Sequence, residues 1–262
     1  MAIPCSPARV LNVERISPNM QRIRFETVGS WRWFTDGIGD ERIDIALPRP
    51  GHDRAELEIF NSPEYGRGWV GEEPPWRHYT VRRVENSGRH FDIDFVIHAG
   101  GLASAWAERA EAGHVIGVFD GESSSSYYRP PADAQHHLLV ADATGLPGLA
   151  RIVEQLPAHV SARALIEVPD PADILVLPSA ATVQFDWITG SGNGLGPSRL
   201  AAAVQELSAP AVPWYAWVAC ESAASRSIRK DLRSRLDLAR DRHHVIGYWT
   251  QDLSGDRAAD LG

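Results

Sequence analysis

Cysteine is scarce in this sequence. Its 262 residues include two, Cys5 and Cys220, which lie far apart and match no spacing typical of metal ligands. A small secreted fold held together by disulfides would need more of them, so that class is excluded. We therefore expect a protein of a reducing compartment, the cytoplasm, without a metal site of its own.

Positive charge and long apolar runs are also lacking. Lysine and arginine total 26 against 34 aspartates and glutamates, which gives a net charge of −8, opposite in sign to the basic surfaces of nucleic-acid-binding proteins. No unbroken run of about 18 apolar residues occurs, and the N-terminus carries no basic flank. We expect no nucleic-acid partner, no secretion and no membrane span.

The first half of the sequence predicts an antiparallel β-barrel. Short β-rich segments alternate with turn-rich or charged ones, and from residue 91 to 97 apolar and acidic residues alternate as in a half-buried strand. Residues 48–75 show little periodicity, and we interpret them as one long surface loop. The predicted strands cover residues 10–16, 21–27, 42–47, 79–84 and 91–97.

The second half predicts an α/β domain. Beyond Pro130 and Pro131, apolar strands alternate with helical segments, a pattern typical of a parallel sheet covered by helices. We place the domain boundary there, giving domains of residues 1–130 and 131–262. The predicted strands are 137–141, 163–168, 214–220 and 244–249, and the predicted helices are 146–156 and 222–236, the second capped by Ser222.

A basic, aromatic segment at residues 77–83 suits a flavin. A flavin dinucleotide needs cations for its pyrophosphate, an aromatic face for its ring and a hydroxyl near the reactive ring atoms. Arg77, Tyr79, Thr80 and Arg82 supply all three within six positions. Strand alternation puts Arg77 and Tyr79 on one face and the other two on the opposite face. A basic strand on a barrel surface is the alternative interpretation.

A glycine-containing turn follows the predicted strand at 91–97. Gly100 and Gly101 lead into a helical segment whose free N–H groups could hold a phosphate, with Ser104 adding a hydroxyl. Trp106 fits the core of the domain better than a cofactor contact. A second glycine-rich stretch, residues 190–196, precedes a helix near Pro197 but has neither dinucleotide nor P-loop spacing, so we interpret it as a loop.

The motifs together resemble the siderophore-interacting protein family. RHYTVRR at 77–83, DFVIHAGGLASAWAERAEAGHVIGV at 94–118, LLVADATGLPGLARIVEQLP at 138–157, WVACESAASRSIRKDLR at 217–233 and GYW at 247–249 occur in the family's order and over nearly the whole chain. The resemblance implies a six-stranded antiparallel FAD-binding β-barrel followed by a nucleotide-binding α/β domain with a parallel sheet, as in the ferredoxin-reductase superfamily.

The resemblance also implies which residues hold the cofactor. Arg77 and Arg82 would lie near the phosphates, Tyr79 against the ring and Thr80 at the flavin's reactive edge. The implied FAD-binding set is Arg77, Tyr79, Thr80, Val81, Arg82, His98, Gly101, Ala103, Ser104, Tyr248 and Trp249.

A second implied set lies on the nicotinamide side. It comprises Asp142, Thr144, Leu146, Pro147, Cys220 and Glu221. Asp142 and Thr144 fall at a strand-to-helix turn, where polar contacts to a reductant are expected. Ala143 stands where the family motif carries glutamate, which departs from the pattern. For Cys220 the alternative is a buried core cysteine.

Three further departures reduce positive charge near the implied flavin site. Asp44 stands where relatives often carry lysine, the loop at 120–128 is acidic and serine-rich and includes Glu122, and Thr250 to Asp252 replace arginines often found there. An anionic chelate would meet more repulsion as a result. Arg42, Arg67 and Arg129 remain as possible substitutes.

The sequence thus predicts an FAD-dependent oxidoreductase. The flavin would receive electrons from NADPH, NADH or a ferredoxin-like donor and pass them to a ferric siderophore, releasing Fe(II). No side chain is assigned a catalytic role. The alternatives are a flavin reductase of the same architecture with another acceptor, and a non-catalytic flavin- or siderophore-binding protein, for which Ala143 is the hint.

Overall fold

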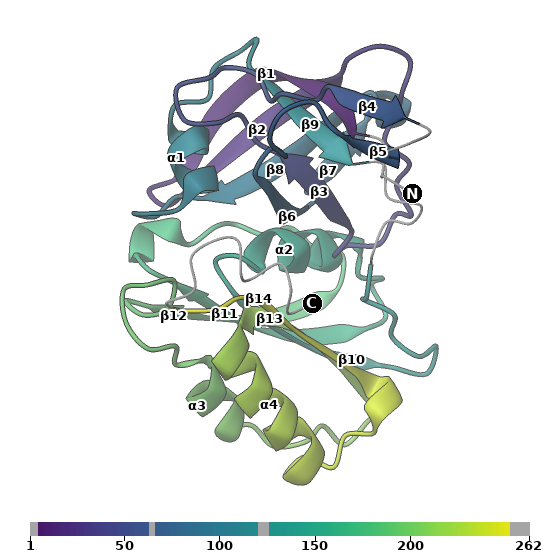
Figure 1. Ribbon diagram of the computed structural model, residues 1–262. Helices are drawn as coiled ribbons and strands as arrows, with labels where there is room; N and C mark the ends of the chain where they lie inside the picture. The colour runs from purple at the N-terminus through teal and green to yellow at the C-terminus, as the bar shows by residue number, and fades with distance from the viewer. Residues whose placement is uncertain (1–4, 63–65, 120–125, 252–262) are drawn as a thin grey trace. The chain divides into compact units, whose positions relative to one another are not determined.

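The computed structural model describes residues 5–62, 66–119 and 126–251 (Figure 1). The chain divides into two compact units. The first comprises the residues up to Ile16, Gln21–Gly37 and Glu41–Ser126, and the second comprises Ser17–Met20, Ile38–Asp40 and the residues from Tyr127 onward. Among the described residues, no helix is long and apolar enough to cross a membrane.

The first unit is built on a sheet of seven strands in the order β6-β3-β9-β1-β2-β8-β7. β1 pairs with β9, β3 with β6 and β9, and β7 with β8, all antiparallel. The strands are β1 Cys5–Ser17, β2 Met20–Thr27, β3 Arg42–Ala46, β6 Trp76–Thr80, β7 Arg83–Glu85, β8 His90–Val96 and β9 Val115–Phe119.

One chain segment forms both edges of this sheet and so closes it into a barrel. β6 and β7 stand at opposite ends of the strand order, yet only Val81 and Arg82 separate them in sequence. The N–H of Val81 donates to the carbonyl of Glu41 (2.9 Å), and that of Arg82 donates to the carbonyl of Asp92 (2.8 Å). The fold class is as predicted, but the strand predicted at 79–84 is two strands joined by a bend, and the sheet has seven strands rather than six.

Aromatic side chains fill the barrel. The ring centroids of Phe25 and Phe91 lie 5.3 Å apart, and those of Phe95 and Trp106 lie 5.6 Å apart. Trp106, on helix α1 (Leu102–Glu108), is buried in this core, as predicted. Asp92 and Asp94 on the opposite face of β8 are also buried, so that strand is covered on both faces rather than half exposed.

The region predicted as one long loop contains a hairpin. β4 (Ile59–Ser62) pairs antiparallel with β5 (Gly66–Trp69) in a two-stranded sheet of their own. Each strand has four residues, and β5 includes two glycines, so no apolar alternation marks them in the sequence. The prediction of an unstructured loop at 48–75 was therefore wrong for these residues.

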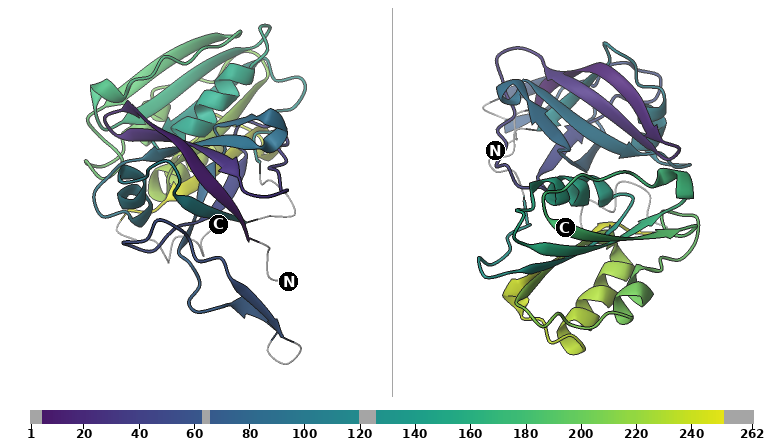
Figure 2. Two further views of the ribbon diagram at one scale, coloured as in Figure 1. Left: turned by 90° about the horizontal axis from the view of Figure 1, so that it is seen from above. Right: turned by 180° about the vertical axis from the view of Figure 1, so that it is seen from behind.

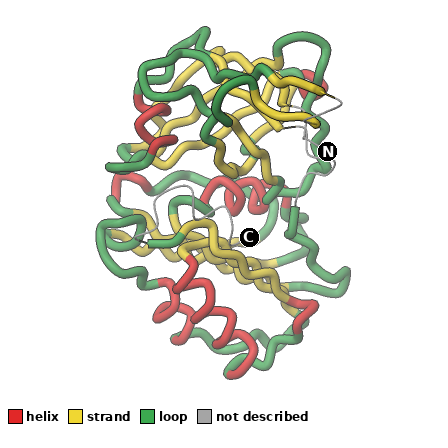
Figure 3. The backbone as a smooth tube through the Cα atoms, viewed as in Figure 1, coloured by secondary structure: helices red, strands yellow, loops and turns green. Residues whose placement is uncertain are grey.

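The second unit is a parallel sheet of five strands in the order β12-β11-β10-β13-β14. Helix α2 covers one face of the sheet, and α3 and α4 cover the other (Figures 1 and 2). Figure 3 shows the helices of this unit in red on either side of its yellow strands. The elements are β10 His136–Asp142, α2 Leu146–Gln155, β11 Ser161–Val168, β12 Thr182–Thr189, α3 Leu200–Gln205, β13 Trp214–Glu221, α4 Ser222–Ser234 and β14 His243–Trp249. The 3₁₀ turns in the described parts of both units are Asn86–Gly88, Pro171–Asp173 and Arg240–Arg242.

The strand order defines a switch point. From β10 the chain proceeds to β11 and β12 on one side, then crosses to β13 and β14 on the other. The carboxyl ends of β10 and β13 therefore flank the crevice where open α/β sheets bind their ligands. The predicted strands and helices of this half all occur, each within a few residues of its predicted ends, whereas β12 was not predicted.

Candidate functional site

The register between β3 and β6 decides which way the predicted flavin-binding side chains face. Tyr79 lies opposite Ile43, and Arg77 lies opposite Ile45, both of which are buried in the barrel core. Opposed residues of an antiparallel pair share a face, so Arg77 and Tyr79 are on the inner side of β6. The ring of Tyr79 lies 4.5 Å from that of Phe95, and burial raises the pKa of its hydroxyl.

Thr80 and Arg82 occupy a different environment from Arg77 and Tyr79. Thr80 pairs with Arg42 on the other face of β6 and is buried. Arg82, beyond the bend, is also buried, and its Nε lies 3.7 Å from Oδ2 of Asp94. The same carboxylate receives two hydrogen bonds from Arg22, at 2.6 and 2.7 Å. The guanidinium of Arg82 therefore belongs to an ion-pair cluster on the barrel.

The turn before α1 is held by its own side chains. The hydroxyl of Ser104 accepts a hydrogen bond from the N–H of His98 and donates one to its carbonyl, both at 2.8 Å. A Cβ on Gly101 would lie 2.5 Å from Cε1 of His98, so a larger residue there would have to displace the imidazole ring. Gly100 has φ +80° and open space where a Cβ would be, and no side chain caps the helix at Gly101. Ala103 is buried in the barrel core.

The unusual Asp44 is partly neutralised by its neighbours. Its Oδ1 lies 2.5 Å from Nδ1 of His78 and 3.3 Å from Nε of Arg42. The guanidinium of Arg42 offsets part of the negative charge that the sequence places on β3. Glu122 and Asp252 lie outside the described residues, as does the side chain of Arg67.

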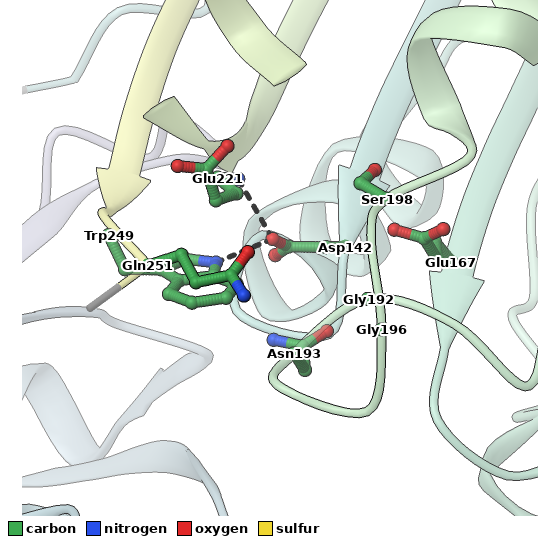
Figure 4. A pocket seen from close by; sticks show the side chains of 9 residues that line it. All are labelled: Asp142, Glu167, Gly192, Asn193, Gly196, Ser198, Glu221, Trp249 and Gln251. Carbon is green, nitrogen blue, oxygen red and sulfur yellow. Dashed lines mark hydrogen bonds between the residues drawn. The ribbon is translucent and has the colours of Figure 1, made fainter. Parts of the chain in front are cut away.

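A pocket in the second unit lies at the carboxyl edge of the parallel sheet (Figure 4). Asp142, Glu167, Glu221 and Trp249 come from the ends of four strands, β10, β11, β13 and β14. The loop after β12 supplies another wall. The described residues that line it are Asp142, Glu167, Gly192, Asn193, Gly196, Ser198, Glu221, Trp249 and Gln251.

Asp142 is the centre of a hydrogen-bond network in this pocket. Its Oδ1 accepts from the backbone N–H (2.9 Å) and hydroxyl (2.6 Å) of Thr144 and from the N–H of Gly145 (3.3 Å). Its Oδ2 accepts from the N–H of Glu221 (2.9 Å) and from Nε1 of Trp249 (2.7 Å). Burial raises the pKa of this carboxyl, an effect that these hydrogen bonds oppose.

Glu221 closes the other side of the switch point and caps α4. Its Oε2 accepts from the N–H groups of Ala223 (2.6 Å) and Ala224 (2.9 Å), so Glu221 rather than Ser222 is the N-cap. The hydroxyl of Ser222 instead contacts the carbonyl of Trp249 and the hydroxyl of Thr250.

The remaining residues predicted on the nicotinamide side are buried and are not among the residues that line the pocket. Cys220 is fully buried against the α3 and α4 side of the sheet, and burial raises the pKa of its thiol. Leu146 and Pro147 are buried in the first turn of α2. Ala143, where the family carries glutamate, donates its N–H to Oδ1 of Asn193 (3.1 Å). Tyr248, which was predicted with Trp249 to contact FAD, is half buried on β14 of the second unit.

Sequence reasoning missed Glu167 and the loop at 190–196. Glu167 is buried, and its Oε1 accepts from the hydroxyl of Ser191 and the N–H of Arg199, both at 2.7 Å. It follows Asp142 by 25 positions at the end of the next strand, the spacing at which dinucleotide-binding folds carry an acidic residue. That spacing was the sequence signal from which Glu167 could have been predicted as a site residue.

Comparison with known families matches both units. A family model described as a siderophore-interacting FAD-binding domain matches residues 9–124, and one described as a siderophore-interacting protein matches residues 134–252. Ferric vibriobactin reductase ViuB of Vibrio cholerae is 30% identical over 219 residues, covering 82% of this chain and 79% of that protein. The NADPH-dependent ferric-chelate reductase of Escherichia coli is 30% identical over 250 residues, covering 92% and 91%.

Solved structures give the same picture of the fold. A siderophore utilization protein from T. fusca superposes with a TM-score of 0.83 at 28% identity, covering 99% of this chain and 97% of that one. A ferredoxin reductase of carbazole 1,9a-dioxygenase superposes with a TM-score of 0.65 at 14% identity, covering 95% and 70%. The second likeness concerns the fold alone.

Proposed function

The chain belongs to the siderophore-interacting protein family, and from that membership we propose that it is an FAD-dependent reductase that passes electrons from NADPH or NADH through the flavin to a ferric siderophore and releases Fe(II). One observation carries the proposal. The two relatives that it matches at 30% identity over both units are each named as ferric reductases. A cytoplasmic location is part of the proposal.

The first unit has residues that fit FAD. Arg77 and Tyr79 share the inner face of β6 and supply a cation and an aromatic face. At Gly100 a Cβ would meet nothing within 4 Å, which leaves the backbone of the turn open to a phosphate group. Bound flavin supplies the capacity to take two electrons from a nicotinamide and to release them singly to iron.

The second unit has the crevice expected for the reductant. The pocket lies at the carboxyl edge of a parallel sheet beside the switch point between β10 and β13, where nucleotides bind in open α/β folds. Asp142 fixes the indole of Trp249 at its rim. These residues would orient the nicotinamide, and no proton transfer by a side chain is required for the reduction.

Reduction would release iron because of ligand hardness. Siderophores commonly bind Fe(III) through hard oxygen atoms, and the softer Fe(II) is held more weakly by such ligands. Arg42 beside Asp44 reduces the repulsion that an anionic chelate would meet on β3.

The purified protein loaded with FAD tests the proposal. Its flavin absorbance should bleach anaerobically when NADPH or NADH is added and return when a ferric siderophore follows, with Fe(II) trapped by a colorimetric chelator. Arg77→Ala should lower FAD affinity, whereas Arg83→Ala should not, because Arg83 is exposed and pairs with Glu85 at 3.6 Å. If the protein shows no bound-flavin absorbance bands after FAD is added, the proposal is contradicted.

A second candidate is a flavin reductase with another acceptor. Asp44 favours it, because this carboxylate lies on the same strand pair as the proposed flavin-binding residues. In that case the reduced flavin would ignore ferric siderophores but return to its oxidised spectrum with a neutral or cationic acceptor.

A further inference from the structure

The pocket of the second unit is lined by three buried carboxylates. Asp142, Glu167 and Glu221 are 2%, 0% and 8% exposed, and the described residues that line the pocket include no lysine or arginine. Asp142 uses both oxygens in hydrogen bonds within the chain, and Glu221 uses one oxygen to cap α4. Two of the three carboxylates therefore have a structural explanation.

Glu167 is different because one of its oxygens has no partner. Its Oε1 accepts from the hydroxyl of Ser191 and the N–H of Arg199. Its Oε2 is buried and makes no hydrogen bond with any described part of the chain. A buried carboxylate oxygen without a donor is costly, so this atom points to a ligand that brings hydroxyl or N–H donors.

The backbone beside this oxygen is kept clear of side chains. A Cβ at Gly192 would lie 2.4 Å from Oε2 of Glu167, and Gly192 has φ +73°. A side chain at position 192 would therefore collide with the buried oxygen, and glycine avoids that collision. In Figure 4 the carboxylate of Glu167 lies on one side of Asp142, with Trp249 and Glu221 on the other, so a ligand crossing the pocket would reach both strand ends.

The position of Glu167 indicates the chemical group it would receive. It ends β11, the strand next to β10 and the switch point. In α/β dinucleotide-binding folds an acid at this place accepts hydrogen bonds from the ribose hydroxyls of the adenosine half. A vicinal diol has two donors for one carboxylate, whereas a 2′-phosphate would bring negative charge against three carboxylates.

The guanidinium of Arg199, whose backbone N–H binds the other oxygen of Glu167, is hydrogen-bonded elsewhere. Nε of Arg199 donates to the hydroxyl of Ser191 (2.8 Å), and its NH2 donates to the carbonyl of Thr189. Both contacts hold the guanidinium on the 189–191 segment. Arg199 could bind a phosphate only if its guanidinium broke the hydrogen bonds to Ser191 and Thr189.

We propose that Glu167 determines the choice of reductant and makes this protein selective for the unphosphorylated dinucleotide NADH over NADPH. The inference rests on the proposed function, because it assigns the nucleotide to the pocket of the second unit. It also distinguishes this chain from its relative in Escherichia coli, which is named for dependence on NADPH.

Calorimetric titration of the oxidised, FAD-loaded protein tests the proposal without turnover. The probes are ADP-ribose and its 2′-phosphorylated form, neither of which can reduce flavin. ADP-ribose should bind at least about tenfold more tightly to the wild type. Glu167→Gln should weaken ADP-ribose binding by about tenfold and bring the two affinities close together. Glu206→Gln, at an exposed position after α3, should leave both affinities unchanged.

Three outcomes would overturn the proposal: equal or tighter binding of the phosphorylated probe by the wild type, an unchanged ratio in a folded Glu167→Gln protein, or no binding of either probe. The ratio of the wild-type affinities for the two probes tests the proposal even where the Glu167→Gln protein fails to fold. Flavin reduced chemically with dithionite provides a separate test of electron transfer to a ferric siderophore. Success there combined with failure of nucleotide selectivity would reject the role of Glu167 and leave the reductase intact.

Discussion

The indole Nε1 of Trp249 donates a 2.7 Å hydrogen bond to Oδ2 of Asp142. The backbone N–H of Glu221 donates to the same oxygen at 2.9 Å. One buried carboxylate therefore connects the carboxyl ends of β10, β13 and β14, which lie far apart in sequence. This contact couples the shape of the pocket to the stability of the sheet.

Removing either side of that bond should destabilise the second unit. Trp249→Phe removes a hydrogen bond to a charged group and should lower the free energy of unfolding by about 1.5–3 kcal/mol. Asp142→Asn should cost more, because an amide would direct N–H groups at some of the donors that now bind the carboxylate. Urea titration of both single variants and the double variant measures the coupling between them. Strictly additive effects would contradict a direct Trp249–Asp142 bond.

Two glycines of one loop should respond differently to alanine. Gly190 and Gly192 both have positive φ, +76° and +73°, but a Cβ on Gly190 meets nothing within 4 Å, while one on Gly192 meets Glu167. Gly190→Ala should therefore lower the free energy of unfolding by about 1–2 kcal/mol, the cost of placing alanine in the left-handed conformation. Gly192→Ala should cost about 1–3 kcal/mol more, as measured by urea unfolding. Equal losses would show that the loop moves aside without penalty.

The buried ion pairs of the barrel should matter more than the surface ones. Asp94 has a side chain 2% exposed and binds Arg22 at 2.6 Å. Arg22→Met would leave that carboxylate short of a partner and should cost about 2–4 kcal/mol. Arg9→Met removes an exposed partner of Glu26, which keeps Arg89, and should have little effect. Similar losses in chemical unfolding would contradict this ranking.

The sequence predicted the second unit better than the first for a physical reason. Strands such as β10 and β13 are buried on both faces, and proline or polar residues mark the adjoining helices, so local signals agree with the fold. β12 was missed because it is an edge strand whose residues are mostly half buried. The bend at Val81 and Arg82 follows from barrel closure, which no local pattern reveals.

The candidate site shows the same division. Asp142 and Glu221 were predicted on the nicotinamide side and Trp249 in the FAD-binding set, and the structure places all three in one pocket of the second unit. Glu167 was missed because it lies near the end of an apolar strand, where the sequence predicts core residues. Its partner Ser191 lies 24 residues further along the chain, in a loop without a recognised motif. Glu167 and Ser191 are brought together by the tertiary structure, which a local sequence pattern does not reveal.

His137 should make the second unit sensitive to mild acid. It is buried on β10, its Nδ1 lies 2.6 Å from the hydroxyl of Tyr128, and burial lowers its pKa to about 4. Burial also lowers the pKa of His136, His243 and His244. Because the unfolded chain titrates near its ordinary pKa, it binds protons first as the pH falls.

The sign of the effect follows from this difference. Between about pH 6.5 and pH 4 the unfolded state carries a proton that folded His137 lacks, so stability falls with decreasing pH by up to about 1.4 kcal/mol per pH unit for this residue. His137→Phe should give a shallower dependence of the unfolding free energy on pH in that window, and the other three histidines should contribute to the dependence that remains. His159→Gln, at an exposed position, is the matched control and should keep the wild-type slope. A slope unchanged in His137→Phe would mean that His137 binds its proton equally in both states, and the buried contact with Tyr128 would then have no part in acid unfolding.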